Sequence, residues 1–198
     1  MSRIAIVSDI HGDLAALRDV LLTIERLGCT ELWCAGDLVD GPDPDDVARI
    51  LEDRGVPTVL GNHDRWALEK RGQPLKLATW MFLERLPKSW WSSRDGTRVA
   101  MFHGSPRADM DALLPEVVDA ARAVHLLDRA DADILVVGHT HLPMLMQVGA
   151  RMIVNPGSLR RGMHRVGDRL VRGGSFGVLE VETRGFRLYD AAGGELPL

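Results

Sequence analysis

Short apolar runs recur along the first third of the chain, separated by segments whose apolar residues have helical spacing. Each run is aliphatic or β-branched and is bounded by turn-forming residues, which is typical of buried strands. The three expected strands are Arg3–Ser8, Glu31–Ala35 and Pro57–Leu60. Strands that alternate with helices in this way favour a parallel sheet with helices on its faces.

Two helices are expected between these strands. In the first, apolar residues recur at helical spacing from Leu14 to Leu27. Asp13 can cap its N-terminus, and Gly28 can end it. The second helix is expected over residues 45–55, beginning at one of the two aspartates that open this range.

The remainder of the chain changes from helical to β-like patterns. A helical pattern over Trp66–Leu86 is split by Gly72 and Pro74, and another helix is expected at about residues 117–130. Further strands are expected at Arg98–Phe102, Ile134–Val137, Arg151–Val154, Ser175–Glu182 and Phe186–Asp190, with a hairpin turn at 183–185. We therefore expect a mixed α/β (α+β) fold, in which two β-rich halves pack as a sandwich between helices.

The composition is that of an ordinary globular chain. It has 198 residues, 45% of them hydrophobic and 26% charged, enough for one domain over residues 1–198 with a full core. The formal net charge of −4 gives no bulk positive field that would attract nucleic acid or a membrane. Local positive charge, which fits a solvated loop or contact with an anionic substrate, gathers at Arg160, Arg161, Arg165, Arg169 and Arg172.

The sequence favours a cytoplasmic protein. No apolar run approaches the roughly 18 residues of a membrane span, and no signal peptide is expected. Cys29 and Cys34 lack the spacing of a redox or metal motif, so buried thiols in a reducing compartment are the simpler interpretation. The sequence leaves open whether the protein forms a homo-oligomer.

Five short polar fragments stand directly after apolar, strand-like runs, and they hold five of the seven histidines. They are Asp9-x-His11, Gly36-Asp37, Gly61-Asn62-His63-Asp64, His103-Gly104 and Gly138-His139-Thr140-His141. Open α/β sheets bind ligands at the carboxyl ends of their strands, so these side chains are expected to meet there. A single Asp after a strand also fits a turn or a helix cap, but five such endings exceed what turns require.

The side chains of these fragments mix oxygen ligands with imidazoles. This mixture suits Mn, Fe, Zn or Co better than Ca or Mg. Ligands two residues apart, as in Asp9-x-His11, can face the same way if the segment is extended. Asp37 can bridge two cations through its two oxygens, and Asn62 can offer a carbonyl oxygen. A pair of adjacent cations is well suited to the hydrolysis of phosphate esters.

His63 differs from the other histidines because a carboxylate, that of Asp64, follows it directly in the sequence. Asp64 is a ready partner for one ring nitrogen of His63, an arrangement that suits acid–base catalysis. An Asx-type turn that starts a helix is the alternative interpretation of this fragment. The sequence lacks the dinucleotide and P-loop fingerprints, the nucleophile elbow and the His-Glu-x-x-His zinc motif.

Taken in order, the motifs resemble those of the calcineurin-like metallophosphoesterase family. The matching motifs are Asp9-x-His11, Gly36-Asp37-x-x-Asp40, Gly61-Asn62-His63-Asp64, His103-Gly104 and Gly138-His139-Thr140-His141. The turn Asn155-Pro-Gly-Ser158 is similar to that of the small bacterial and archaeal phosphodiesterases of the family. The resemblance implies a four-layer αββα sandwich of two mixed β-sheets flanked by helices, with a dinuclear site at the strand ends.

The resemblance also implies a role for each residue of the motifs. One metal would be held by Asp9, His11, Asp37 and His141, and the other by Asp37, Asn62, His103 and His139. His63 would be the acid that contacts the phosphate, with Asp64 as its orienting partner. The cofactors would be two divalent transition-metal ions sharing a bridging hydroxide, with Mn expected first and Fe, Zn, Co or Ni as alternatives.

Two positions separate this chain from the protein Ser/Thr phosphatases of the superfamily. Gly41 stands where those enzymes have Arg, and Asp64 stands where they have Glu, so phosphopeptides are not the expected substrates. We expect a phosphodiesterase that acts on a small phosphoester, with a nucleotide as one option.

Two alternatives remain. A phosphomonoesterase could use Arg160 and Arg161 as a clamp, and a non-catalytic metal-binding scaffold is the role that the small retromer subunit of the superfamily implies. Four tryptophans of the irregular middle segment fit base stacking, helix packing or a subunit contact: Trp66, Trp80, Trp90 and Trp91.

Overall fold

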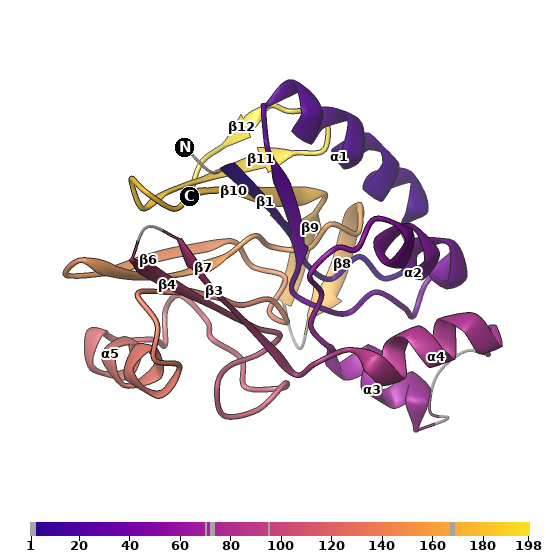
Figure 1. Ribbon diagram of the computed structural model, residues 1–198, viewed down its shortest axis with the longest axis horizontal. Helices are drawn as coiled ribbons and strands as arrows, with labels where there is room; N and C mark the ends of the chain where they lie inside the picture. Colours follow the sequence, from indigo (N-terminus) through magenta and orange to yellow (C-terminus); the bar gives the residue numbers. More distant parts are fainter. Residues whose placement is uncertain (1–2, 70, 72–73, 95, 167–168) are drawn as a thin grey trace.

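The computed structural model describes residues 3–69, 71, 74–94, 96–166 and 169–198. Two five-stranded mixed sheets lie face to face, and helices cover both outer faces (Figure 1). This arrangement confirms the predicted four-layer αββα sandwich. The side chains of Arg165 and Arg169, two members of the predicted basic run, lie outside the described part of the chain.

The first sheet joins the two ends of the chain in the strand order β12-β11-β10-β1-β2. Its strands are β1 (Arg3–Val7), β2 (Glu31–Cys34), β10 (Ser175–Glu180), β11 (Gly185–Asp190) and β12 (Glu195–Leu196). β1 runs parallel to β2 and antiparallel to β10. The parallel N-terminal pair is thus extended by antiparallel strands from the C-terminal part, as the sequence predicts.

The second sheet has the strand order β3-β4-β5-β7-β6. Its strands are β3 (Ser89–Arg94), β4 (Thr97–Phe102), β5 (Ile134–Val136), β6 (Met144–Val148) and β7 (Arg151–Asn155). A separate antiparallel hairpin is formed by β8 (Gly162–Val166) and β9 (Arg169–Gly173).

The central strands bury side chains on both of their faces. Along β1, Ile4 and Ile6 pack between the two sheets, whereas Ala5 and Val7 pack toward the helices. Successive side chains of a strand point to opposite faces, so a strand buried on both sides must be apolar at every position. This explains why the central strands appear in the sequence as unbroken apolar runs.

Five helices in the described part of the chain complete the two outer layers. They are α1 (Leu14–Arg26), α2 (Pro44–Asp53), α3 (Asn62–Leu68), α4 (Leu77–Arg85) and α5 (Ala120–Arg129). The predicted cap of α1 is confirmed, because Asp13 Oδ1 accepts a hydrogen bond from the Ala16 N–H at 2.9 Å. The structure starts α2 at Pro44, slightly earlier than predicted, since proline is well suited to the first helical position. Among the described helices, none is long and apolar enough to cross a membrane.

The strand predicted at Pro57–Leu60 is wrong. Within the described residues, this segment forms a single parallel bridge, between Thr58 and Cys34, before the chain turns into α3. The helix predicted over Trp66–Leu86 is two helices, α3 and α4, with Pro74 in the break. Gly72, the other predicted breaker, lies outside the described residues.

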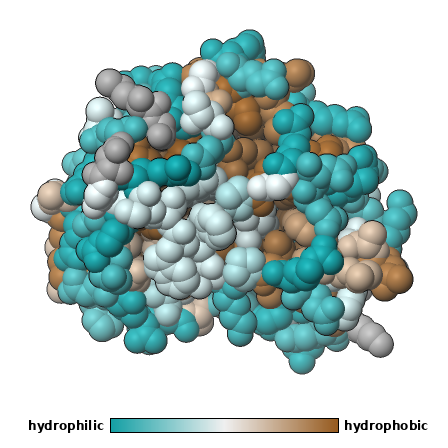
Figure 2. Space-filling view, viewed as in Figure 1, coloured by the Kyte–Doolittle hydropathy of each residue, from teal (hydrophilic) through white to brown (hydrophobic). Residues whose placement is uncertain are grey.

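The sequence did not predict β3, the edge strand of the second sheet. Trp91 packs edge-on against Phe102, with ring centroids 5.5 Å apart, and its indole N–H donates to the Ala130 carbonyl at 3.0 Å. Figure 2 shows a pale surface of intermediate hydropathy over β3, as expected for a strand of Trp and Ser. Trp90 and Trp91 therefore belong to a sheet edge and not to an irregular segment.

Candidate metal centre and active site

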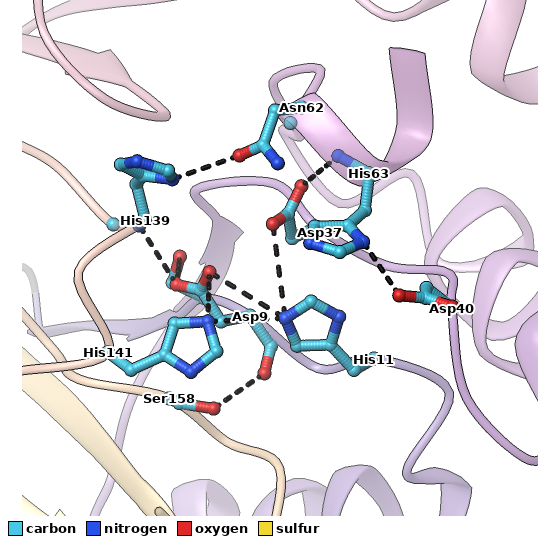
Figure 3. A network of polar contacts seen from close by, with 12 residues as sticks. Asp9, His11, Asp37, Asp40, Asn62, His63, His139, His141 and Ser158 are labelled. Carbon is cyan, nitrogen blue, oxygen red and sulfur yellow. Dashed lines mark hydrogen bonds and ion pairs between the residues drawn. The ribbon is translucent and has the colours of Figure 1, made fainter. Parts of the chain in front are cut away.

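The seven predicted metal ligands converge at one edge of the sandwich. Figure 3 labels all of them except His103. Four of them stand within three residues of the ends of β1, β2, β4 and β5: Asp9, Asp37, His103 and His139. Asn62 was predicted to follow a strand, but it is the first residue of α3. Parallel strands present their carboxyl ends at the same edge, so ligands that are distant in sequence meet there.

Asp9, His11 and His141 form the first donor group. His141 Nε2 is 3.1 Å from Asp9 Oδ1, and His11 Nε2 is 4.0 Å from the same oxygen. The two Nε2 atoms lie 3.2 Å apart. His11 Nδ1 is 3.2 Å from the Val39 carbonyl oxygen, which orients the ring so that Nε2 faces the carboxylates.

Asp37, Asn62, His103 and His139 form the second donor group. His103 Nε2 is 3.2 Å from Asp37 Oδ2 and 3.0 Å from Asn62 Oδ1. His139 Nδ1 is 2.9 Å from the same Asn62 oxygen. The other ring nitrogen of His103 is held by the Ala35 carbonyl oxygen at 2.7 Å. Asn62 Oδ1 therefore faces two imidazoles at once, as a carbonyl ligand would.

The ligand loops are left-handed, not extended. Positive φ angles occur at Asp9 (53°), His11 (46°), Asp37 (56°), Asp40 (73°), His139 (66°) and His141 (58°). The extended segment that would let Asp9 and His11 face the same way is therefore not present, although the two side chains do meet. Asp and His adopt this region more readily than branched residues. Backbone strain of this kind clusters at functional sites, where the surrounding structure maintains it.

Gly61 allows the start of α3 to approach the loop that carries Asp37. A Cβ atom at position 61 would lie 2.1 Å from Asp37 Oδ1 and 2.3 Å from the Asp37 nitrogen, which no side chain could tolerate. The close approach lets the His63 N–H donate to Asp37 Oδ1 at 2.8 Å. Asp37 is thereby fixed between α3 and the ligands.

Burial and opposite charge act against each other on the pKa values of the ligands. Burial alone would raise the pKa of Asp9, but the nearby imidazoles, His141 first, hold it well below its usual range. Burial would lower the pKa of His103, but Asp37 raises it to about 10. For His11, burial prevails and lowers the pKa of the ring. Burial would also raise the pKa of Asp37, but His103 holds it below its usual value, so both buried carboxylates depend on positive charge beside them.

The donor set fits divalent metal ions. Asp9 Oδ1 is completely buried and receives no hydrogen bond from any described residue. His11 and His141 point their Nε2 atoms at each other and at this oxygen. A cation among these atoms would satisfy the Asp9 carboxylate and the Nε2 lone pairs of His11 and His141. Imidazole nitrogen together with carboxylate oxygen is a ligand combination of transition metals.

His63 has a carboxylate partner, but it is Asp40. His63 Nδ1 is 2.7 Å from Asp40 Oδ2. The ring packs edge-on against His11 at 4.8 Å and Trp66 at 4.7 Å between centroids. Figure 3 shows the His63 ring beside the ligands, with Asp40 on its outer side. The signal for this partner was the second aspartate of Gly36-Asp37-x-x-Asp40, to which the sequence analysis gave no role.

The predicted pairing of Asp64 with the His63 ring is wrong. Asp64 is fully buried, and its carboxylate accepts four backbone N–H groups at 2.9–3.2 Å. The donors are the N–H groups of Asp37, Leu38, Val39 and Gly61. Adjacent helical residues point in different directions, so Asp64 faces the ligand loop while His63 faces the site. Burial, with the charge of Asp37, raises the pKa of Asp64 to about 6 despite these donors.

Replacing Asp64 with alanine is expected to destabilise the fold, because the four buried N–H groups would lose their acceptor. Each unsatisfied buried donor costs about 1–3 kcal/mol, so several kcal/mol should be lost in chemical unfolding. Asp64→Asn keeps one carbonyl oxygen and should lose less. An Asp64→Ala variant with wild-type stability and slow turnover would instead restore Asp64 as the partner of His63.

The turn Asn155-Pro-Gly-Ser158 supports the ligand loops from behind. Ser158 Oγ donates to the Asp9 carbonyl at 2.9 Å. The Asn155 side-chain amide donates to the Gly138 carbonyl at 2.8 Å and to Thr140 Oγ1 at 3.1 Å. The sequence alone indicates only a turn here, since nothing in it shows which loops the turn contacts.

Comparison with known families agrees with this geometry. The model of the calcineurin-like phosphoesterase superfamily domain matches residues 2–184. The chain belongs to this superfamily. Calcineurin-like phosphoesterases use divalent metals, and the His and Asp groups described above are its candidate ligands in this chain.

Similar proteins come from archaea and bacteria. An uncharacterized protein of Methanocaldococcus jannaschii, MJ0912, is 27% identical over 177 residues, covering 80% of this chain and 70% of that protein. The metallophosphoesterase structure from Sphaerobacter thermophilus has a TM-score of 0.71 at 24% identity, covering 98% of this chain and 88% of that one. An archaeal phosphodiesterase structure has a TM-score of 0.61 at 18% identity, covering 95% and 99%. Vps29 structures share the fold as well.

Proposed function

We propose that this calcineurin-like phosphoesterase hydrolyses phosphodiesters at a dinuclear metal site, with Mn as the first candidate metal. One ion would be held by Asp9, His11, Asp37 and His141, and the other by Asp37, Asn62, His103 and His139. The observation that carries this proposal is the place of Asp37. Its Oδ2 borders both donor groups, 3.9 Å from His11 Nε2 and 3.2 Å from His103 Nε2.

When bound, two such ions polarise the phosphoryl oxygens and lower the pKa of a water molecule that serves as nucleophile. The protein contributes the orientation of the ligands. The Val39 and Ala35 carbonyl oxygens hold one ring nitrogen of His11 and of His103, which turns the other nitrogen toward the carboxylates. Such outer contacts fix the tautomer and the direction of a metal-binding imidazole.

His63 is the proposed proton donor to the leaving oxygen. Asp40 holds Nδ1, so Nε2 is the nitrogen that remains for the substrate. Trp66 and His11 pack against the ring and limit its rotation. Asp64 supports this function only indirectly, because its hydrogen bonds fix the loop of Asp37.

The surroundings of Arg161 favour a diester over a monoester. A monoester carries more charge than a diester and needs more positive clamps. Arg161, one of two candidate clamps, donates to both Asp13 oxygens at 3.0–3.1 Å and lies 3.6 Å from Asp19. The charge of Arg161 is therefore already neutralised, and Arg160 is the one candidate clamp that remains. The phosphodiesterase among the fold neighbours is consistent with this preference.

Mn-loaded protein is expected to hydrolyse bis(p-nitrophenyl) phosphate with a higher kcat/KM than p-nitrophenyl phosphate, followed by nitrophenolate absorbance. Protein stripped of metal is the control for metal dependence. A monoester preference of about tenfold, or about 1.4 kcal/mol, would make the protein a phosphomonoesterase instead. Fully metallated protein that hydrolyses neither compound would support the scaffold alternative.

A further inference from the structure

A cavity of about 250 Å³ lies beside the second donor group, where the loop after β4 meets α3 and the start of β3. His103, a proposed metal ligand, forms part of its wall, and Phe102 provides apolar surface. The loop is anchored to α3 because Arg65 Nε donates to Asp109 Oδ2 at 2.6 Å. In Figure 1 this loop follows β4 and faces α3 at the lower side of the molecule.

Positive charge dominates the cavity. Three basic side chains line it, Arg65, Lys88 and Arg107, against one carboxylate, Asp109. Asp109 and Glu69 already pair with Arg65. The side chains of Lys88 and Arg107 have no hydrogen bond or ion pair with any residue that the structure describes. Two uncompensated cations in one cavity of a chain with a net charge of −4 form a local site for an anion.

The cavity borders the metal site through His103. Its wall includes His103 of the second donor group but not His63, the proposed proton donor to the leaving group. Because the leaving group must reach His63, which does not line the cavity, we assign the cavity to the other substituent. In a phosphodiester the remaining candidate is the second substituent, which stays on the phosphorus.

We propose that this cavity binds an anionic group, a second phosphate or a carboxylate, on the retained substituent of a phosphodiester. The inference rests on the proposed function and adds a substrate class to it. The volume is below the roughly 300–1,000 Å³ of pockets that enclose a drug-sized ligand, so the cavity suits a charged group and not a complete nucleotide. Lys88 and Arg107 are then specificity-determining residues, because each would give a charge-assisted hydrogen bond to the anion.

Two chromogenic diesters that differ by one phosphate test this proposal. Both thymidine 5′-(p-nitrophenyl phosphate) and its 3′-phosphorylated form release p-nitrophenol and retain the nucleoside. Wild-type protein should favour the 3′-phosphorylated diester by about tenfold or more in kcat/KM. Lys88→Ala/Arg107→Ala should lose this preference and keep its activity on the diester without the 3′-phosphate. Added salt should weaken the preference, because the two cations are exposed.

Arg18→Ala/Arg54→Ala is the matched control. It removes the same charge from two exposed arginines that do not line the cavity, and it should keep the preference. A preference lost equally in both double variants, or absent from wild type while both diesters are hydrolysed, would overturn the cavity assignment and leave the proposed function intact.

Calorimetry with thymidine 3′,5′-bisphosphate and thymidine 5′-monophosphate gives a second readout that needs no turnover. Wild type should bind the bisphosphate about tenfold more tightly, and Lys88→Ala/Arg107→Ala should bind the two equally. If the affinities follow this pattern but neither diester is hydrolysed, the proposed function is contradicted and the cavity assignment stands. Equal affinities in wild type would contradict the cavity assignment.

Discussion

Replacing His63 with alanine is expected to lower kcat by about 10²–10⁴-fold and to leave the metal content unchanged. The reason is that His63 Nδ1 pairs with Asp40 and its ring lies beside the ligands without belonging to either donor group. Turnover of an aryl diester and elemental analysis of the same preparation measure the two effects separately. The loss should shrink for diesters whose leaving group is a weaker base, because these need less help from an acid.

Asp40→Asn is the companion variant. It keeps the size of the partner of His63 and removes its charge, so kcat should fall less than in His63→Ala, again without loss of metal. A His63→Ala protein with wild-type turnover would remove His63 from the mechanism. A His63→Ala protein that lost metal would instead make His63 a ligand, since His11, Asp40 and His63 also lie close enough together to bind one.

Replacing Asp37 is expected to have the largest effect on metal content. Wild-type protein loaded with Mn should carry about two ions per chain, and Asp37→Asn should carry fewer, because the neutral amide cannot supply the charge that both donor groups border. Asparagine retains an oxygen that can accept the His63 N–H, so the loop should remain folded. Elemental analysis measures the ions, and circular dichroism confirms the fold.

Asp64→Asn is the control, because this buried carboxylate faces backbone N–H groups and offers no oxygen to either donor group. It should keep its metal if it folds. Full metal occupancy in Asp37→Asn would contradict the bridging role of Asp37, and wild-type protein that binds no metal after Mn loading would contradict the whole site.

The sequence predicted the site more completely than its supporting structure. The ligand types can be recognised locally, because a His after an apolar run has no special turn chemistry and five such polar endings exceed what turns require. Partners are different, because the side chain that contacts His63 depends on where a loop passes in space. Asp64 is adjacent in sequence yet points into the loop of Asp37, whereas Asp40 reaches the ring from the far end of that same loop.

The fold was predictable where burial imposes a regular spacing of apolar residues, and less so for short segments and edge strands. β1 and α1 have the spacing that their buried faces require, and both were found. The segment Pro57–Leu60 has the composition of a strand but turns at Gly61 after one bridge, a tertiary constraint that no local pattern contains. β3 was missed for the opposite reason, because an edge strand with Trp and Ser on its open sides shows no apolar alternation.

The left-handed ligand loops impose two demands on the same six positions. A residue there must coordinate or orient, and it must also accept a positive φ, which Asp, Asn and His do more readily than most residues. Few residue types at these positions are therefore compatible with a working site. Once it is not used, a change of a ligand to glycine would remove the ligand and relieve strain of about 1–3 kcal/mol in a single step. Loss of chemistry would then be accompanied by a gain in stability, so a chain of this kind has a short evolutionary route from hydrolase to inert framework.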